Sequence, residues 1–321
     1  MATAGETQQR YRGALDRLVQ RLRADRTILA TVLCGSLSHD TVWEKSDIDL
    51  VLVMVDDEKI ARHEGIALVE DDVNIHAMLW TRGEFRKMAE GSKRNSFIHS
   101  LLAKGRLIYS HDPSLETLFP QLQRIGSRDT QDQLLRAGIS VLPFYDKAQK
   151  WFLTRGDLHY ASLWLLYAAT PLAQIEVYSR GLLADREVLP QALKLNPEFF
   201  GPNYTELLDK PKTKARIAAA IASVGTYLSE RRELLFKPVL DYLREAGEIR
   251  SATEIEHEFT KQHGISGVIT ACEYLAYEGV ITKAGSPVRL TRRSNVQVEE
   301  MAFVHLSDQP DLGPIPHDLA Q

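Results

Sequence analysis

The segment at residues 34–50 constrains the fold of this chain more than any other part of its sequence. An apolar run ends just before the pair Gly35-Ser36, and after a spacer of ten residues the acidic pair Asp47-Ile-Asp49 opens a second apolar run. Short apolar runs bounded by polar residues are typical of buried β-strands. The sequence therefore predicts two neighbouring strands joined by a loop that begins with Gly-Ser.

The two carboxylates of this segment are expected to share one face of a strand. Side chains at positions i and i+2 of a strand point the same way, so Asp47 and Asp49 repel each other by roughly 3 kcal/mol at ~5 Å and an effective dielectric near 20. A bound Mg²⁺ ion would remove that repulsion. Gly35 lets backbone N–H groups approach an anion, and the Ser36 hydroxyl can donate a hydrogen bond to it. Together these residues predict a nucleoside-triphosphate site.

Each motif also has an ordinary structural interpretation. Asp-x-Asp occurs on solvated strand ends, and Gly-Ser occurs in common turns. Here the two motifs stand at strand–turn–strand spacing, and the apolar run at 50–55 predicts that the strand continues into the core beyond the acidic pair. This combination favours a functional site.

In this segment the chain resembles the DNA polymerase β-like nucleotidyltransferase superfamily, whose signature is Gly-Ser, a spacer and Asp-x-Asp. It is similar in particular to the kanamycin-type aminoglycoside nucleotidyltransferases, which carry Gly-Ser-Leu and Ser-Asp-Ile-Asp with the same spacer. The resemblance implies an enzyme that holds one or two Mg²⁺ ions on Asp47, Asp49 and a third carboxylate. Such an enzyme transfers a nucleoside monophosphate, here expected to be AMP, from a nucleoside triphosphate to a hydroxyl of a small, aminoglycoside-like molecule and releases pyrophosphate.

The resemblance places the third carboxylate on a neighbouring strand, just before a Val-Asn pair. Asp72 occupies that position, so we expect it to be catalytic and to bind metal with the acidic pair. Period-two geometry puts Asp72, Asn74 and His76 on one face of the strand. Glu70 and Asp71 compete with Asp72 for the role, and His76 is a candidate for the pocket lining.

The resemblance also implies a general base on the first helix of the next domain, followed four residues later by a lysine that contacts phosphate. Asp146 and Lys150 have this spacing, and residues at i and i+4 share a helix face. The alternative is an exposed ion pair worth about 0.3 kcal/mol. His39 stands where the kanamycin-type turn carries an arginine, so His39 and Lys45 are the remaining candidates for nucleotide binding, with Gly35-Ser36 and Lys150.

The expected fold class is α+β, in four parts. A small mixed-sheet nucleotidyltransferase domain covers residues 1–125, a helical bundle for substrate or partner covers 126–235, a winged helix-turn-helix-like domain covers 236–306, and a tail covers 307–321. The first part alternates helical and strand patterns, whereas the second shows helical periods almost throughout. The resemblance does not extend to the winged-helix segment.

Individual elements follow from hydrophobic periodicity and capping residues. In the first domain the expected elements are a helix at 11–26, strands at 28–34, 47–55, 72–80 and 105–109, and a helix at 59–69. In the second domain Pro143 and Pro171 fall within helical runs, so each is expected to begin or kink a helix.

The last domain carries a clear helix-start signal but little for DNA binding. Ser251 and Glu254 form a capping-box pattern, Gly264 is expected to end that helix, and two strands are expected around the Gly-Ser-Pro turn at 285–287. The would-be recognition helix at 265–278 has no Lys or Arg and two Glu. Because cations dominate affinity for DNA, we expect a packing or dimerisation module there rather than a DNA-binding one.

Composition excludes several classes of protein. The chain has 39 Lys and Arg against 43 Asp and Glu, which does not suit a protein that coats nucleic acid. Its two cysteines, Cys34 and Cys272, lack zinc-site spacing and cannot form a disulfide framework, so a reducing compartment is expected. No secretory signal or membrane-spanning run is visible, and we therefore expect a cytoplasmic protein.

Two other functions remain open at the level of sequence. One is an antitoxin-type nucleotidyltransferase that modifies a protein partner, and the other is a non-catalytic nucleotide sensor with the winged helix as its output. The resemblance implies a homodimer that shares its active site. Acidic residues available for a cationic acceptor are Glu84, Asp146, Asp157 and Glu176, while Tyr160, Trp164 and Tyr167 form either a core stripe or an aromatic cleft.

Overall fold

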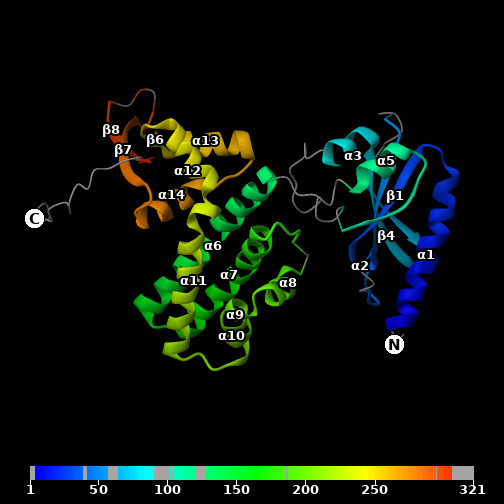
Figure 1. Cartoon of the computed structure of the whole chain (residues 1–321), viewed down its shortest axis with the longest axis horizontal. Coiled ribbons are helices and arrows are strands. Elements are labelled where there is room, and N and C mark those ends of the chain that lie inside the picture. Colours follow the sequence, from blue (N-terminus) through cyan, green and yellow to red (C-terminus); the bar gives the residue numbers. More distant parts are fainter. Residues whose placement is uncertain are drawn as a thin grey trace, which may run out of the picture. The chain divides into compact units, whose positions relative to one another are not determined.

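The computed structural model describes residues 4–38, 42–56, 64–89, 102, 104–120, 127–184, 187–291, 293 and 295–305. The chain divides into two compact units, Met1–Asp129 and Thr130–Gln321, which we call unit 1 and unit 2 (Figure 1). Unit 1 carries a mixed sheet flanked by helices, and unit 2 is mainly helical with a small sheet near its end. The fold class is therefore α+β.

Unit 1 is organised around a five-stranded sheet in the order β3-β4-β2-β1-β5. The strands are β1 (Ile28–Cys34), β2 (Ile48–Met54), β3 (Gly65–Glu70), β4 (Val73–Thr81) and β5 (Arg106–Ser110). Only β2 and β4 pair in parallel, and the other neighbours are antiparallel. The four strands expected from apolar runs are confirmed as β1, β2, β4 and β5.

The expected helix at 59–69 is wrong where the structure describes it, because Gly65–Glu70 forms strand β3. This strand lies at the edge of the sheet and is largely exposed, so its side chains do not alternate clearly between polar and apolar. The charged residues that precede it in the sequence also suggested a helix. It pairs with β4 through a two-residue turn in which Asp71 and Asp72 both have positive φ, 47° and 57°. Residues 57–63 lie outside the described part of the chain.

Helices cover the sheet of unit 1. Helix α1 (Ala4–Ala24) buries an apolar stripe against residues such as Leu33, Leu50 and Ile75. Alternate residues on the strands, among them Val32 and Val51, point to the opposite face and are also buried. Helix α3 (Arg82–Ala89) contacts β2 and β4, and α5 (Pro113–Leu118) contacts α3 and β5 (Figure 1).

Unit 2 begins with long and short helices around one hydrophobic core. These are α6 (Ser127–Arg155), α7 (Leu158–Ser179), α8 (Val188–Leu195), α9 (Pro197–Phe200), a π-helical turn (Gly201–Thr205), α10 (Glu206–Asp209) and α11 (Lys214–Leu235). The core runs from Leu134 of α6 to Phe303 near the end of the described chain. Helices α6 and α7 continue through Pro143 and Pro171, so neither proline begins a helix. None of the helices in the described ranges is long and apolar enough to cross a membrane.

The described residues at the end of unit 2, from 237 to 305, form three helices and three strands. They are α12 (Lys237–Ala246), β6 (Arg250–Ser251), α13 (Ala252–His263), α14 (Val268–Tyr277), β7 (Thr282–Arg289) and β8 (Gln297–Val304), with the sheet order β6-β8-β7. The capping box of Ser251 and Glu254 is confirmed, as is the left-handed Gly264 that ends α13. This element order is one that a winged helix has, and the winged-helix assignment stays a prediction.

The expected Gly-Ser-Pro turn at 285–287 is wrong. Strand β7 runs straight through these residues, and its partner is β8, which periodicity did not identify. Pro287 is tolerated because β7 lies at the edge of the small sheet, where one side of the strand needs no hydrogen-bond partners.

Candidate functional site

Gly35 brings the backbone of the Gly-Ser loop against the carboxylate of Asp49. Cys34 at the end of β1 pairs with Asp49 of β2, so the next residue lies beside that side chain. Gly35 has φ +65°, and a Cβ atom at this position would collide with Asp49 Oδ2. Only glycine fits both the backbone angle and the contact. The loop that the sequence marked as an anion cradle is therefore adjacent to the acidic pair.

Asp47, Asp49 and His76 form a compact group of side chains of types that can bind a metal ion. Asp49 pairs with His76 across the parallel strands β2 and β4. The Nδ1 atom of His76 lies 2.8 Å from Oδ2 of Asp47, and one ligand atom from each of the three residues lies within 4.8 Å of the others. Two ligands on opposite sides of an octahedral ion are about 4.2 Å apart at metal–oxygen distances near 2.1 Å. The 4.8 Å limit is slightly above this span, so small side-chain movements would bring all three residues onto one ion.

Asp72, the expected third carboxylate, is not part of this group. It lies in the exposed turn between β3 and β4, four residues before His76, which is roughly 13 Å along a strand. Its two competitors form ion pairs with arginines of α1. Asp71 pairs with Arg17, and Glu70 pairs with Arg21. The third position beside the acidic pair is occupied by His76.

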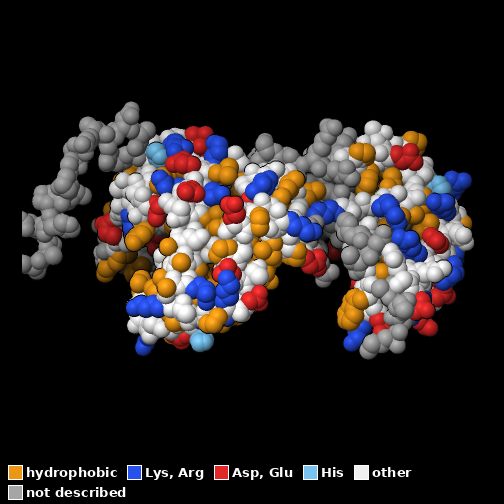
Figure 2. All heavy atoms as spheres, turned by 60° about the horizontal axis from the view of Figure 1, so that its bottom comes forward, with side chains coloured by type: hydrophobic (Ala, Val, Ile, Leu, Met, Phe, Trp, Pro, Cys, Tyr) orange, Lys and Arg blue, Asp and Glu red, His pale blue; other side chains and the backbone are white. Residues whose placement is uncertain are grey.

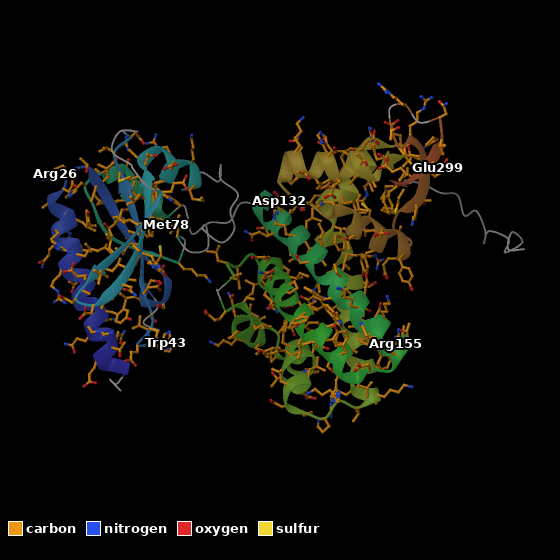
Figure 3. All side chains as sticks on the ribbon, turned by 180° about the vertical axis from the view of Figure 1, so that it is seen from behind. Arg26, Trp43, Met78, Asp132, Arg155 and Glu299 are labelled. Carbon is orange, nitrogen blue, oxygen red and sulfur yellow. The ribbon has the colours of Figure 1, made fainter. Side chains whose placement is uncertain are left out.

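The loop before Asp47 is anchored by a buried tyrosine of α1. The hydroxyl of Tyr11, which is 2% exposed, donates to the carbonyl of Ser46 at 2.6 Å and approaches that of Glu44 at 3.2 Å. Ser46 also closes a turn with Trp43, which lies near the N-terminal half of α1 in Figure 3. These contacts fix the chain direction as it enters the acidic pair.

Ser36 and Lys45 are the remaining nucleotide-binding candidates that the structure describes in unit 1. Ser36 lies in the short helix α2 (Gly35–Ser38), so the loop expected to begin at Gly35-Ser36 begins instead with one turn of helix. The Lys45 ammonium group lies 5.9 Å from the centre of the Trp43 ring, two residues before Asp47 in the chain. His39 lies outside the described residues.

Asp146 and Lys150 both lie on α6 of unit 2, and both are exposed. No ion pair joins them in the described part of the chain, so the structure gives no support to the simple salt-bridge alternative. The pKa of Asp146 is raised above its ordinary value, first by partial desolvation and then by the negative charge of Glu273. A raised pKa brings a carboxylate closer to the range in which a general base works.

The other acids considered for a cationic acceptor have structural partners. Glu84 accepts a hydrogen bond from the backbone of Thr81 at 2.9 Å, and Asp157 caps α7 by accepting from the backbone of Tyr160 at 2.9 Å. Glu176 is 3% exposed and is held by a network within unit 2. Three of the four acids therefore have structural roles.

The aromatic residues of α7 lie at the margin of the core, in contact with α6. Trp151 and Tyr160 meet edge to face at 4.5 Å between ring centres, and Phe144 stacks on Trp164 at 6.1 Å. Trp164 packs against the core, whereas Tyr167 is 50% exposed. The stripe is thus partly core and partly surface.

The N-terminus of α14 offers no open site for DNA phosphate. The carboxylate of Glu256 accepts hydrogen bonds from the backbone N–H groups of Gly267 at 2.5 Å and Val268 at 3.0 Å. Figure 2 shows Lys and Arg side chains interspersed with Asp and Glu over the face in view. Neither feature supports the phosphate neutralisation on which DNA affinity depends.

Comparison with known proteins supports the fold. No family model matches the chain, and no curated protein matches it. Among solved structures, the chain is similar to a nucleotidyltransferase-like protein from Exiguobacterium sibiricum 255-15, with a TM-score of 0.59 and 16% sequence identity. The likeness covers 92% of this chain and 99% of that one, so it spans both units. The fold is therefore nucleotidyltransferase-like, and the Gly35 loop and the Asp47–Asp49–His76 group lie in the unit that carries the expected signature.

Proposed function

We propose that this chain is a metal-dependent nucleotidyltransferase. It transfers a nucleoside monophosphate, AMP in the first instance, from a nucleoside triphosphate to a hydroxyl group of a small molecule and releases pyrophosphate. The observation that carries the proposal is the contact of Gly35 with Asp49, which puts a close-approach backbone loop beside the group formed by Asp47, Asp49 and His76. The nucleotidyltransferase-like fold supports the same conclusion.

The donor set of the group fits a divalent cation. Two carboxylates and an imidazole are all common ligands of such ions, and both aspartates are already held close together on and just before β2. A bound divalent ion would supply the positive charge that offsets the charge of the triphosphate and of the leaving pyrophosphate. Magnesium is the ion that the resemblance implies.

The chain's own residues have distinct proposed roles. The backbone at Gly35 and the hydroxyl of Ser36 bind phosphate oxygens, with Lys45 and Lys150 as further cations for the triphosphate. Asp146 accepts the proton of the attacking hydroxyl, either in the same chain or in a second copy. Its raised pKa supports this role, because a carboxylate with a very low pKa is a poor base.

An aminoglycoside-like acceptor is the proposed substrate class. Such a molecule carries several positive charges, and Asp146 lies close enough to Glu273 for their negative charges to interact. Two neighbouring carboxylates on an exposed surface suit a polycation, since each ion pair formed there relieves their mutual repulsion.

Pyrophosphate release tests the proposal. The full chain is incubated with each of the four nucleoside triphosphates, Mg²⁺ or Mn²⁺, and a panel of aminoglycosides and other polyhydroxylated amines. We expect release that requires metal and acceptor and that falls about 100-fold or more in Asp47→Asn and Asp49→Asn, the usual effect of losing a positioned catalytic group.

The matched control is Asp71→Asn, in which an exposed aspartate of the same unit pairs with Arg17 outside the group. It should release pyrophosphate at close to the wild-type rate. Equal release by wild type, Asp47→Asn and Asp49→Asn would show that the acidic pair is not the active site.

A further inference from the structure

We propose that the metal site of this chain selects a first-row transition ion, with Mn²⁺ as its representative, over Mg²⁺, because His76 supplies the third ligand. The inference rests on the metal site of the proposed function but does not depend on transfer activity. It concerns which ion the residues bind, and it follows from the register of β2 and β4.

Among the described His, Cys, Asp and Glu residues, His76 is the one that completes the group with Asp47 and Asp49. Asp49 pairs with His76, whereas Asn74, two residues earlier on β4, pairs with Val69 of the edge strand on the other side. Within the described ranges, no other His, Cys, Asp or Glu joins Asp47 and Asp49 in a group of this kind. The third ligand is therefore a nitrogen atom rather than a carboxylate oxygen.

A nitrogen ligand changes the preference of the site in two ways. Mg²⁺ is a hard cation that favours oxygen ligands and gives up its water molecules reluctantly, whereas imidazole is a good ligand for transition ions. Replacing a carboxylate with a neutral imidazole also lowers the negative charge of the site by one unit. The binding of Mg²⁺ depends on the negative charge of its ligands and is therefore weakened. The binding of a transition ion is strengthened by the nitrogen ligand.

The His76 imidazole is oriented for this role before any ion binds. Its Nδ1 atom lies 2.8 Å from Asp47, and the side chain is exposed, so it can turn toward an ion with little rearrangement. The contact with Asp47 already places the imidazole beside the acidic pair.

The direct test detects nitrogen bound to Mn²⁺. Electron spin echo envelope modulation of the Mn²⁺-loaded full chain should show coupling to an imidazole nitrogen in wild type and lose it in His76→Asp and His76→Gln. The matched control is His159→Gln, which replaces an exposed histidine of α7 in unit 2 and should keep the coupling. Circular dichroism confirms that each variant is folded.

Competition between the two ions gives the second readout. Dissociation constants for Mn²⁺ and Mg²⁺ are measured by calorimetry, and the preference is the ratio of the two. Sites made only of carboxylates also bind Mn²⁺ somewhat better than Mg²⁺. The decisive quantity is therefore the change in this ratio between wild type and His76→Asp. We expect His76→Asp to reduce the preference for Mn²⁺ at least tenfold, mainly through tighter binding of Mg²⁺.

An unchanged ratio in His76→Asp, an absence of nitrogen coupling in wild type, or an absence of Mn²⁺ binding would each overturn the inference. The proposed function fails in a different way. If the chain binds Mn²⁺ through His76 but transfers no nucleotide with any ion, the metal assignment stands and the enzyme assignment falls.

Discussion

The imidazole Nδ1 atom of His76 lies 2.8 Å from Oδ2 of Asp47, between a residue that enters β2 and a residue in the middle of β4. Because β2 and β4 run in parallel, residues far apart in the sequence meet at the same end of the sheet. The contact joins the acidic pair, which the sequence predicted to bind metal, to His76, which the sequence predicted only as a residue of the pocket lining. It also turns two repelling carboxylates into part of a mixed group with a hydrogen-bond donor.

Substitution of Gly35 by alanine should disrupt the site. Gly35 has positive φ and an added methyl group would collide with Asp49, so Gly35→Ala must move either the loop or the carboxylate. We expect loss of metal binding by calorimetry and a destabilisation of about 2 kcal/mol, within the range for strained left-handed positions. Gly156→Ala is the control, because Gly156 has φ +62° with open space around it, and it should cost only the backbone strain and leave metal binding intact. Equal metal affinity in both variants would argue against the close approach.

Removal of the Tyr11 hydroxyl should loosen the loop that leads to Asp47. Tyr11→Phe deletes the hydrogen bond to the carbonyl of Ser46 without changing the packing of the ring. We expect a loss of about 1 kcal/mol in the free energy of unfolding, together with weaker metal binding. Tyr277→Phe removes a hydroxyl from a side chain that is 90% exposed and should change neither quantity. If Tyr11→Phe lost stability but kept full metal affinity, the loop would not be positioning Asp47.

The pH dependence of transfer tests the proposed base. Asp146 must be deprotonated to act, so the rate should rise with pH through its pKa, which lies above the ordinary value for aspartate. Removing the charge of the exposed Glu273 in Glu273→Gln lowers that pKa, and the acidic limb of the kcat/KM profile should move to lower pH. Asp146→Asn should lower kcat about 100-fold and leave metal binding unchanged. Glu248→Gln is the remote control and should leave the pH profile unchanged. If Glu273→Gln also left the profile unchanged, Asp146 would be excluded as the titrating group.

Glu176 should contribute stability that depends on pH. Its carboxylate is bound by Arg180 at 2.7 Å, Tyr227 at 2.8 Å and Asn196 at 3.1 Å. Although burial alone would raise the pKa of Glu176, these hydrogen bonds and the Arg180 charge lower it below the usual range. Glu176→Gln should therefore cost about 2 kcal/mol at neutral pH, as for hydrogen bonds to charged groups.

The sign of the pH effect follows from the lowered pKa. The stabilising contribution of Glu176 is fully present above the unfolded pKa of about 4.3 and is lost as pH falls through the lower folded value. The stability difference between wild type and Glu176→Gln, measured by urea unfolding, should therefore shrink from pH 6 toward the acidic limit. Glu206→Gln, which breaks a largely exposed pair with Lys210, should cost less than about 0.5 kcal/mol at any of these pH values. A difference that grows on acidification would contradict the assignment.

Local sequence patterns predicted most strands of unit 1 but not which residues of neighbouring strands lie opposite each other. The period-two alternation of residues 72–77 correctly put Asn74 and His76 on the open face, with Val73 and Ile75 buried. It could not tell which open-face residue meets the acidic pair, because that depends on the register between two strands separated in the chain. The register pairs Asp49 with His76 and leaves Asp72 in the turn.

The elements that the sequence did not predict are those in which local signals compete. Strand β3 follows a charged stretch and lies at a sheet edge, so it lacks the clear alternation of a half-buried strand. Strand β8 contains Glu299 and Glu300, and β7 contains Gly285 and Pro287, residues that ordinarily mark turns. Tertiary pairing in the small sheet outweighs these preferences.

The fate of the phosphorus atoms tests the central claim most directly. The full chain is supplied with metal, an acceptor that supports pyrophosphate release, and ATP labelled with ³²P at either the α- or the γ-position. Nucleotidyl transfer predicts that the α-label appears on the acceptor and the γ-label in pyrophosphate, and that both products vanish in Asp49→Asn. Transfer of the γ-label to the acceptor, or the same products from Asp49→Asn as from wild type, would contradict the account.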